Sequence, residues 1–274
     1  MSEKKHNDQC IVIPGSKVSL DRRDTGGKKF AALKKDAAMR RLSELTQELR
    51  ELQDRFYAAH DKKILVILQA MDTGGKDSTI RHVFTGINPQ GVRVINFKAP
   101  GIEELDHDYL WRIHKHTPRK GEIVIFNRSH YEDVLVARVH RLVNENTWKK
   151  RYGHINEFER MLSDEGALIL KFFLHISKDE QKKRLAKRLS DKKRSWKFDE
   201  NDLKERKLWD VYMKAYEEAI EKTSTEWAPW RVIPSDRKWL RNLLVMQHIV
   251  KAVKCLDPEY PTPSMPLKGG VELI

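Results

Sequence analysis

Apolar and polar positions along the chain form alternating blocks that predict strands and helices in turn. Short continuous apolar runs are typical of strands covered on both faces, and they occur at residues 64–68, 92–97, 123–126, 168–176 and 231–233. Helical periodicity occupies the intervals, at residues 33–60, 103–114, 131–143, 156–164, 178–189, 202–223 and 236–253. Strands separated by helices predict an α/β fold with a parallel sheet flanked by helices.

The first of these helices carries an apolar seam. Its members follow each other at alternating steps of three and four residues: Leu42, Leu45, Leu49, Leu52 and Phe56. Such a seam packs a helix onto its own domain or joins two copies of the chain. We expect packing within the domain first and self-association second, because about two heptads do not define a coiled coil.

The first apolar run leads straight into a glycine turn, a lysine and a helix. Gly74 and Gly75 expose backbone N–H groups that favour a phosphate anion together with the positive end of the next helix, and Lys76 adds a charge. The spacing departs from a standard phosphate loop, since Ala70 replaces a glycine and Asp77 replaces the usual Ser or Thr. An ordinary strand-turn-helix is the alternative.

Carboxylates and an arginine near the ends of two apolar runs favour phosphoryl transfer. Asp72 precedes the glycines, and a carboxylate beside a phosphate is unfavourable unless a cation such as Mg²⁺ lies between them. After the run at 123–126, Arg128 can neutralise charge on a transferring phosphoryl group, and Glu132 and Asp133 can hold Mg²⁺ or position the acceptor. The structural alternative, a capping box formed by Ser129 and Glu132, is compatible with catalysis. The residues after the first run and those after the run at 123–126 are expected at the same edge of the sheet.

A basic segment at residues 182–197 contains Asp191 as its single acid. It is typical of a solvated helix face or a nucleic-acid patch, and in a phosphotransferase it serves as a lid that closes over phosphates. Arg184 and Arg188 lie one helical turn apart, so they can reach one anion together. Trp196 can stack on a base or pack at the lid hinge.

A second basic region, which includes Lys98, follows the second apolar run. His107, His114 and His116 lie among its cations, but their spacing is not that of a zinc site and no cysteine is nearby. We expect phosphate contacts or ordinary hydrogen bonds from these side chains, and no metal other than Mg²⁺.

Composition narrows the class of protein. The 274 residues are 39% apolar, which is enough for one large core, and the net charge of +13 implies a polyanionic partner such as nucleic acid, an anionic membrane or a phosphate polymer. Cys10 and Cys255 lie far apart and fit a reducing cytoplasm. A polar start and the lack of a long apolar run predict neither a secretion signal nor a membrane span.

Together these groups resemble the polyphosphate kinase 2 family, within the phosphate-loop (P-loop) kinases related to thymidylate kinase. The likeness runs from about residue 26 to residue 256. It is carried by QAMDTGGKDS at 69–78, NPQG at 88–91, FKAP at 97–100, ELDHDYLWR at 104–112, FNRSHYEDVL at 126–135, RSWKF at 194–198 and WRVIPSD at 230–236. It implies a three-layer P-loop kinase domain at residues 33–256 with a basic helical lid at about 180–205. An arm at 1–32 and a tail at 257–274 complete the expected organisation.

The resemblance also implies the roles of residues. Catalytic roles fall on Asp72, Lys76, Arg128, Asp133 and Arg188, with Asp72 and Asp133 holding Mg²⁺. The residues expected to bind nucleotide or polyphosphate belong to the phosphate loop, the basic region, the second strand end or the lid: Gly74, Gly75, Asp77, Ser78, Lys98, Asn127, Glu132, Arg184, Arg194 and Trp196.

The activity implied is transfer of the terminal phosphoryl group of inorganic polyphosphate to ADP, with the reverse reaction also expected. Many family members have an aspartate where this chain has Asn127, and the carboxylates here are Glu132 and Asp133. This variant resembles the subgroup that phosphorylates both nucleoside mono- and diphosphates, so AMP is expected as a second acceptor. We expect a cytoplasmic homo-oligomer, a dimer or tetramer, that binds neither nucleic acid nor membrane.

Two other functions share parts of these motifs. A nucleotide kinase with ATP as donor would have the same loop and lid but no use for so many cations. A nucleic-acid-binding ATPase would share the charge, yet the cations here do not alternate with aromatic stacking positions.

Overall fold

The strands form one parallel sheet, as the apolar runs predict. In the computed structural model, which describes residues 9–192, 195–197 and 199–262, the five strands lie in the order β2-β3-β1-β4-β5. The strands are β1 (Lys63–Gln69), β2 (Val92–Asn96), β3 (Ile123–Asn127), β4 (Ala167–His175) and β5 (Trp230–Pro234). Each neighbouring pair is parallel, and Leu68 of β1 lies opposite Asn127 of β3. The loops that follow β1 and β3 are therefore neighbours at one edge of the sheet.

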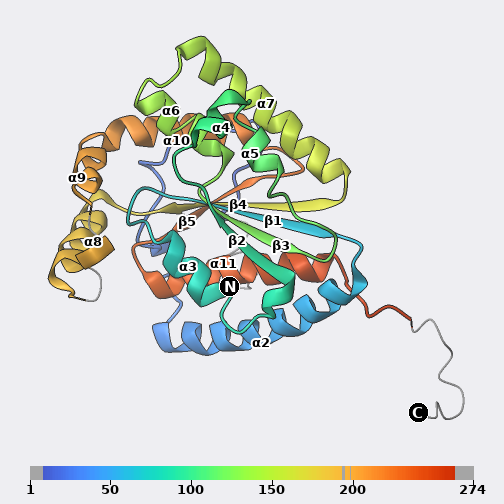
Figure 1. Cartoon of the computed structure of the whole chain (residues 1–274). Helices are drawn as coiled ribbons and strands as arrows, with labels where there is room; N and C mark the ends of the chain where they lie inside the picture. The colour runs from blue at the N-terminus through green and yellow to red at the C-terminus, as the bar shows by residue number, and fades with distance from the viewer. Residues whose placement is uncertain (1–8, 193–194, 198, 263–274) are drawn as a thin grey trace, which may run out of the picture.

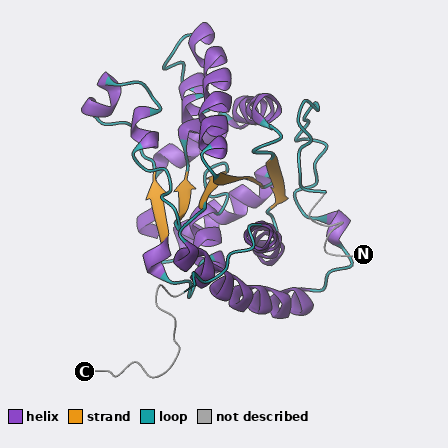
Figure 2. Cartoon of the chain, turned by 90° about the vertical axis from the view of Figure 1, so that its right-hand side faces the viewer, coloured by secondary structure: helices purple, strands orange, loops and turns teal. Residues whose placement is uncertain are grey.

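Helices cover both faces of this sheet and give three layers (Figures 1 and 2). The helices are α2 (Lys35–Ala59), α3 (Lys76–Val83), α4 (Ile102–Asp106), α5 (Trp111–His114), α6 (Val136–Val139), α7 (Glu145–Asp164), α8 (Lys178–Ser190), α9 (Glu200–Lys207), α10 (Trp209–Thr223) and α11 (Lys238–Cys255). Short 3-10 turns are η1 (Lys28–Phe30), η2 (Pro89–Gly91), η3 (His130–Asp133) and η4 (Ser195–Lys197). One face packs against α2, α3 and α11, and the other against α5, α7 and α10.

The continuous apolar run of β1 is explained by these two layers. Leu65 and Ile67 point into the cluster with α7 and α10, whereas Ile64, Val66 and Leu68 point into the cluster with α2 and α11. Successive side chains of a strand face opposite sides, so a strand covered on both sides needs apolar residues at every position.

The apolar seam of α2 is used within the molecule. Leu42, Leu45, Leu49, Leu52 and Phe56 are all buried, and they pack in the same cluster as the apolar residues of α11. Packing within the domain, the first of the two alternatives for this seam, is therefore confirmed.

Three predicted helices were wrong in detail. The helix expected at 103–114 is divided into α4 and α5, because the Asp108 carboxylate accepts the amides of Leu110 and Trp111 and starts a new helix. The segment 131–143 forms only η3 and α6, since the Tyr131 phenol is held in the core. The helix expected at 202–223 breaks at Leu208, because every residue of α9 is at least partly exposed whereas α10 packs in the core.

A fourth helix is longer than predicted. α7 begins at Glu145 instead of residue 156, and its N-cap is Asn144, whose side chain accepts the Thr147 amide. The N-cap, together with the buried Trp148 and Tyr152, was a readable signal of this start.

Residues 10–12 lie along the edge of the sheet. Ile11 forms an isolated antiparallel bridge with Arg231 of β5, through hydrogen bonds that involve Cys10, Val12, Trp230 and Val232. This contact is what we expect of an arm laid over the domain. Among the residues that the structure describes, no helix is both long and apolar enough to cross a membrane.

Candidate active site

The loop between β1 and α3 has the geometry of a phosphate cradle. Gly75 has a φ of 107° and Thr73 a φ of 59°, and the Gly74 amide donates to the Met71 carbonyl at 2.8 Å. Gly75 is the N-cap of α3, so the amides of this turn and the positive end of the helix are available to an anion. The phosphate-binding interpretation therefore fits the backbone better than an ordinary turn does.

Lys76 folds back over this loop. Its ammonium donates to the Ala70 carbonyl at 2.9 Å. Burial, reinforced by the nearby Arg128, lowers the pKa of Lys76, and Asp72 opposes this effect. A phosphate bound in the loop would offer the ammonium a stronger, charged acceptor.

Arg128 lies between two carboxylates at the edge of the loop. Its guanidinium is 2.9 Å from Asp72 Oδ1 and 3.9 Å from Glu132 Oε2. Burial alone would lower the pKa of Arg128, but Glu132 and Asp72 outweigh it and leave the pKa raised. The fold thus brings Asp72, Lys76, Arg128 and Glu132 together, as expected for the ends of adjacent parallel strands.

Asn127 joins the ends of three elements. Its amide donates to Asp77 Oδ1 at 2.8 Å and to Asn96 Oδ1 at 2.6 Å, and so connects β3, α3 and β2. Ser78, in the first turn of α3, accepts from Arg241 at 3.2 Å. Both residues lie beside the loop, where the sequence placed them.

Asp133 faces away from this group. Arg151 donates to its carbonyl oxygen at 2.9 Å and to its Oδ1 at 3.3 Å. Burial raises the pKa of Asp133 to about 6. The expected pair of metal ligands is therefore divided: Asp72 lies at the loop, and Asp133 lies against Arg151.

The donor set fits a divalent metal that is shared with phosphates. Within the described ranges, no group of three or more His, Cys, Asp or Glu side chains could hold a metal by itself. Ions bound beside phosphates commonly take only one or two carboxylates from the protein and complete their shell with substrate oxygens. Asp72, partly exposed and adjacent to the cradle, can supply such a ligand.

Helices α8 and α9, with η4 between them, form a helical lid beside the loop (Figure 1), and the basic segment covers most of α8 and η4. Gln181 donates to the Asp72 carbonyl at 2.9 Å, and Arg184 donates to the carbonyls of Gly74 and Ser235 at 2.9 and 2.5 Å. Arg188 contacts Asp202 of α9 at 2.7 Å. Arg184 therefore supports the loop, whereas Arg188 contacts α9. That the two arginines share one anion stays a prediction.

Three other predicted residues lie at the periphery. Lys98 is exposed, and its carbonyl accepts from Arg112 at 2.9 Å. Trp196 in η4 is 75% exposed. Arg194 lies outside the described residues.

A cavity of about 290 Å³ lies between the loop, the Arg128 turn and the lid. Its lining residues are Ala70, Met71, Asp72, Arg128, Glu132, Val136, His140, Asn201, Glu205, Tyr212 and Tyr216. The Tyr212 hydroxyl donates to Glu205 at 2.5 Å, and His140 lies 3.0 Å from the same carboxylate. The sequence did not reveal His140, Glu205, Tyr212 or Tyr216, because no motif marks them and three of them belong to the lid and its return helix.

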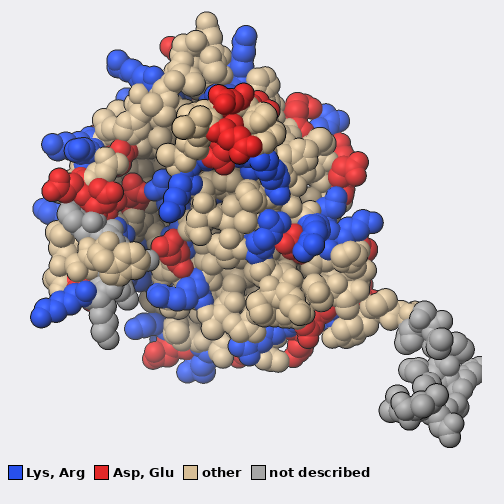
Figure 3. Space-filling view, viewed as in Figure 1, with Lys and Arg blue, Asp and Glu red and all other residues tan. Residues whose placement is uncertain are grey.

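Charge is less concentrated than the sequence suggested. On the face shown in Figure 3, lysine and arginine side chains extend over the lid and across the middle of the molecule, with acidic groups between them. On this face the basic groups do not form one continuous patch.

The fold and the site define a class before any comparison is made. A parallel sheet with a phosphate loop after β1, an arginine after β3 and a helical lid is a P-loop kinase. The model of the family described as "Polyphosphate kinase 2 (PPK2)" matches residues 32–261.

Relatives and a solved structure agree with this match. The chain is 55% identical over 252 residues to the AMP/ADP-polyphosphate phosphotransferase of Meiothermus ruber, covering 92% of this chain and 94% of that one. It is 44% identical over 227 residues to the ADP-polyphosphate phosphotransferase of Rhodopseudomonas palustris, covering 78% of each. The crystal structure of polyphosphate kinase 2 from Arthrobacter aurescens superposes with a TM-score of 0.91 at 42% identity, covering 95% of this chain and 93% of that one. The chain belongs to the polyphosphate kinase 2 family and is a phosphotransferase.

Proposed function

We propose that this enzyme transfers the terminal phosphoryl group of inorganic polyphosphate to ADP, giving ATP, and to AMP, giving ADP, with Mg²⁺ as the metal and in both directions. The observation that carries the proposal is the contact of Arg128 with Asp72 and Glu132 beside Lys76 and the loop. The names of the Meiothermus ruber and Rhodopseudomonas palustris relatives support these substrates.

The proposed reaction is a direct in-line transfer. A terminal phosphate oxygen of the acceptor attacks the terminal phosphorus of polyphosphate, the bridging P–O bond breaks, and the departing chain is one phosphate shorter and keeps the bond electrons. Such a transfer is catalysed mainly by positioning and by neutralising charge. The residues at this site offer both without a covalent intermediate.

Each group at the loop has a place in that reaction. The amides of Gly74 and Gly75 and the ammonium of Lys76 would hold the donor phosphates, and Arg128 would stabilise the transferring group. Arg188 of the lid would act beside Arg128. We place the acceptor in the cavity lined by Glu132, Tyr212 and Tyr216, because it opens directly onto Arg128.

Asp72 is the residue we propose as first ligand of Mg²⁺, and a bound Mg²⁺ would neutralise charge on the phosphates at the loop. A metal role for Asp133 stays a prediction, since its contacts are with Arg151. Homo-oligomeric assembly, a cytoplasmic location and the domain boundaries at residues 33 and 256 also stay predictions.

The test is an assay without ATP. Purified enzyme with polyphosphate, Mg²⁺ and either ADP or AMP is expected to form ATP or ADP, and Lys76→Ala is expected to lower kcat about 100-fold or more. Lys62→Ala removes the same charge at the opposite, amino end of β1, where Lys62 is exposed, and should leave the rate unchanged.

Other results would favour the other two functions. Transfer from ATP but not from polyphosphate would support an ordinary nucleotide kinase, and ATP hydrolysis stimulated by DNA or RNA would support a nucleic-acid-dependent ATPase. Either result in place of polyphosphate-dependent transfer contradicts the proposal.

A further inference from the structure

The turn at residues 128–132, which follows β3, has a fully buried centre. Ser129, His130 and Tyr131 are fully buried, whereas Arg128 and Glu132 on either side of them line the cavity. Arg128 has a φ of 64°, a conformation that a residue with a side chain keeps only when its surroundings hold it. The buried residues of the turn therefore determine how Arg128 and Glu132, which are partly exposed, point.

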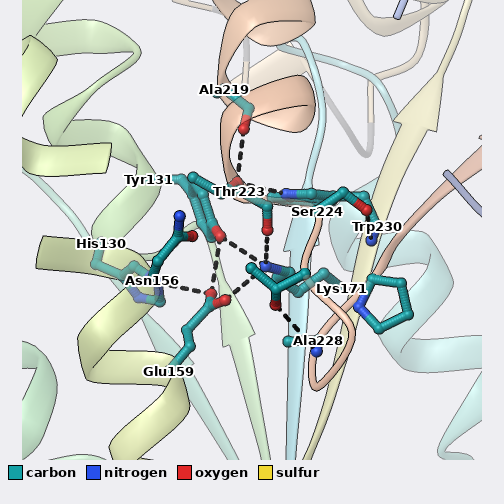
Figure 4. Close-up of polar contacts among 12 residues, drawn as sticks. His130, Tyr131, Asn156, Glu159, Lys171, Ala219, Thr223, Ser224, Ala228 and Trp230 are labelled. Atoms are coloured by element: carbon teal, nitrogen blue, oxygen red, sulfur yellow. Dashed lines mark hydrogen bonds and ion pairs between the residues drawn. The ribbon is translucent and has the colours of Figure 1, made fainter. Parts of the chain in front are cut away.

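Two consecutive side chains of this turn end on one carboxylate (Figure 4). His130 Nε2 lies 3.2 Å from Glu159 Oε1, and the Tyr131 hydroxyl donates to the same oxygen at 2.8 Å. The Lys171 ammonium donates to the Tyr131 hydroxyl at 2.9 Å, to Glu159 Oε2 at 2.5 Å and to the Thr223 carbonyl at 2.6 Å. All the donors of the ammonium are thereby used.

This cluster connects the turn to three other elements. Glu159 belongs to α7, Lys171 to β4, and Thr223 is the last residue of α10. Tyr212 and Tyr216 of α10 line the far side of the cavity. The cluster thus sets the position of the Arg128 turn relative to the helix that faces it. The ammonium also lies where the carbonyl end of α10 carries partial negative charge, which stabilises it there.

Stability alone does not account for charged groups at this place. A buried ion pair roughly recovers the cost of removing its charges from water, so apolar residues of similar volume often serve stability equally well. Burial alone would raise the pKa of Glu159, but Lys171 and His130 outweigh it and lower the pKa, so the carboxylate is charged. What a charged, hydrogen-bonded cluster adds is direction, because each of its hydrogen bonds specifies an angle as well as a distance.

We propose that Glu159 and Lys171 are positioning residues that hold Arg128 in place for the transferring phosphoryl group, and that they act through His130 and Tyr131. The inference rests on the proposed function, since it concerns how Arg128 is presented to the substrate. Neither side chain can touch a substrate in this structure, because both are 0% exposed. They therefore act through the residues that they contact.

The first test removes one hydroxyl from the cluster. Tyr131→Phe keeps the ring and both charges but removes the bond donated to Glu159 and the acceptor of Lys171. We expect kcat for ADP phosphorylation to fall about 10-fold, with the KM for polyphosphate changed less than about 2-fold, because misplacement of Arg128 affects the transition state more than donor binding. The paired variant Glu159→Gln/Lys171→Met removes both charges together. It should also lower kcat with little change in the KM for polyphosphate.

A double-mutant cycle separates positioning from general damage. If Tyr131 acts through Arg128, Tyr131→Phe should change kcat less than about 2-fold in an Arg128→Ala background. Glu122→Gln is the matched control, since it weakens a partly buried ion pair with Arg93 at the opposite end of β3. It should lower the melting temperature and leave kcat unchanged.

Two results would overturn the inference: Tyr131→Phe with the kcat of the wild type, or an undiminished effect of Tyr131→Phe when Arg128 is absent. These two results differ from what failure of the proposed function would give. If the proposed function is wrong, the wild type and Glu122→Gln would themselves show no transfer from polyphosphate.

Discussion

Three residues in a left-handed backbone conformation lie beside the phosphate loop. Thr73, Gly75 and Arg128 all have a positive φ and border the phosphate loop. Such conformations are unfavourable for residues with side chains and persist where neighbouring contacts specify them. The conformations of the loop and of Arg128, which we propose as catalytic, therefore depend on the residues packed behind them.

Arg241 of α11 is one of these residues. It is fully buried, it donates to Ser78 at 3.2 Å and to Asn242 at 2.8 Å, and burial together with Arg184 lowers its pKa to about 9. A Cβ at Gly75 would lie 2.0 Å from its Nη1. Glycine is required at position 75 by this contact as well as by the positive φ.

We expect Gly75→Ala to abolish the cradle without unfolding the protein. The new methyl group must displace either Arg241 or the loop, so kcat/KM should fall about 100-fold or more. Gly153→Ala is the control, because a Cβ at that position of α7 meets nothing within 4 Å, and it should stabilise the helix by about 1 kcal/mol. Phosphotransfer rates and urea unfolding of both variants check this. Near-wild-type activity of Gly75→Ala would show that the contact with Arg241 is unimportant.

Sequence reasoning located the site residues that directly follow the end of a strand. Asp72, Lys76 and Arg128 follow β1 and β3, which are neighbours in the sheet, so their approach follows from topology. The same reasoning could not separate Glu132 from Asp133. Their side chains diverge toward Arg128 and Arg151, and that divergence depends on the 3-10 turn η3.

At the scale of elements, α8 presents two kinds of basic residue. Lys182, Lys183 and Lys187 are exposed, whereas Arg184 and Arg188 are partly buried toward the loop and α9. Asp202, the partner of Arg188, has a pKa raised by burial and by the charge of Asp72, which shows that this contact lies near the catalytic group. Helical periodicity predicted that the two arginines share a face. In the structure Arg184 donates to Glu180 of α8 itself and to the carbonyls of Gly74 and Ser235, whereas Arg188 contacts Asp202 of α9.

We expect substitution of a partly buried arginine of α8 to lower kcat more than substitution of an exposed lysine. Arg188→Met should lower kcat at least 10-fold, because a guanidinium is lost from the transferring group. Lys183→Met removes an equal charge from the exposed face and should change kcat less than about 2-fold. Steady-state rates at fixed ionic strength compare them. Equal losses in both variants would mean that the lid acts only through its total charge.

At the scale of the whole molecule, α11 occupies the centre of one layer. It packs between α2 and the sheet, and its His248 is 4% exposed, with its ring centroid 6.0 Å from that of Phe172. Burial lowers the pKa of His248 well below its ordinary value, and Arg231 and Lys251 lower it further. The imidazole is therefore neutral in the folded protein.

This histidine should make the fold sensitive to acid. In the unfolded chain its pKa is about 6.5, so below that pH the unfolded state binds a proton that the folded state excludes. Its contribution to stability is complete above that pH and is lost as the pH falls toward the lowered pKa of the folded state. As the pH falls below ~6.5, the free energy of unfolding should thus fall more steeply in the wild type than in His248→Phe. Denaturant unfolding measures both, and parallel pH profiles would contradict the assignment.

The sequence alone determined the α/β class, the parallel sheet, the phosphate loop and the arginine after the second neighbouring strand. These features depend on local periodicity and on a rule of sheet topology, both of which can be read along the chain. Only the tertiary structure decided that Arg184 supports the loop, that Glu205 and Tyr212 line the cavity, and that Glu159 and Lys171 hold the Arg128 turn. The physical reason is that periodicity identifies which face of an element is buried, whereas the partner of a polar group is set by packing between segments distant in sequence.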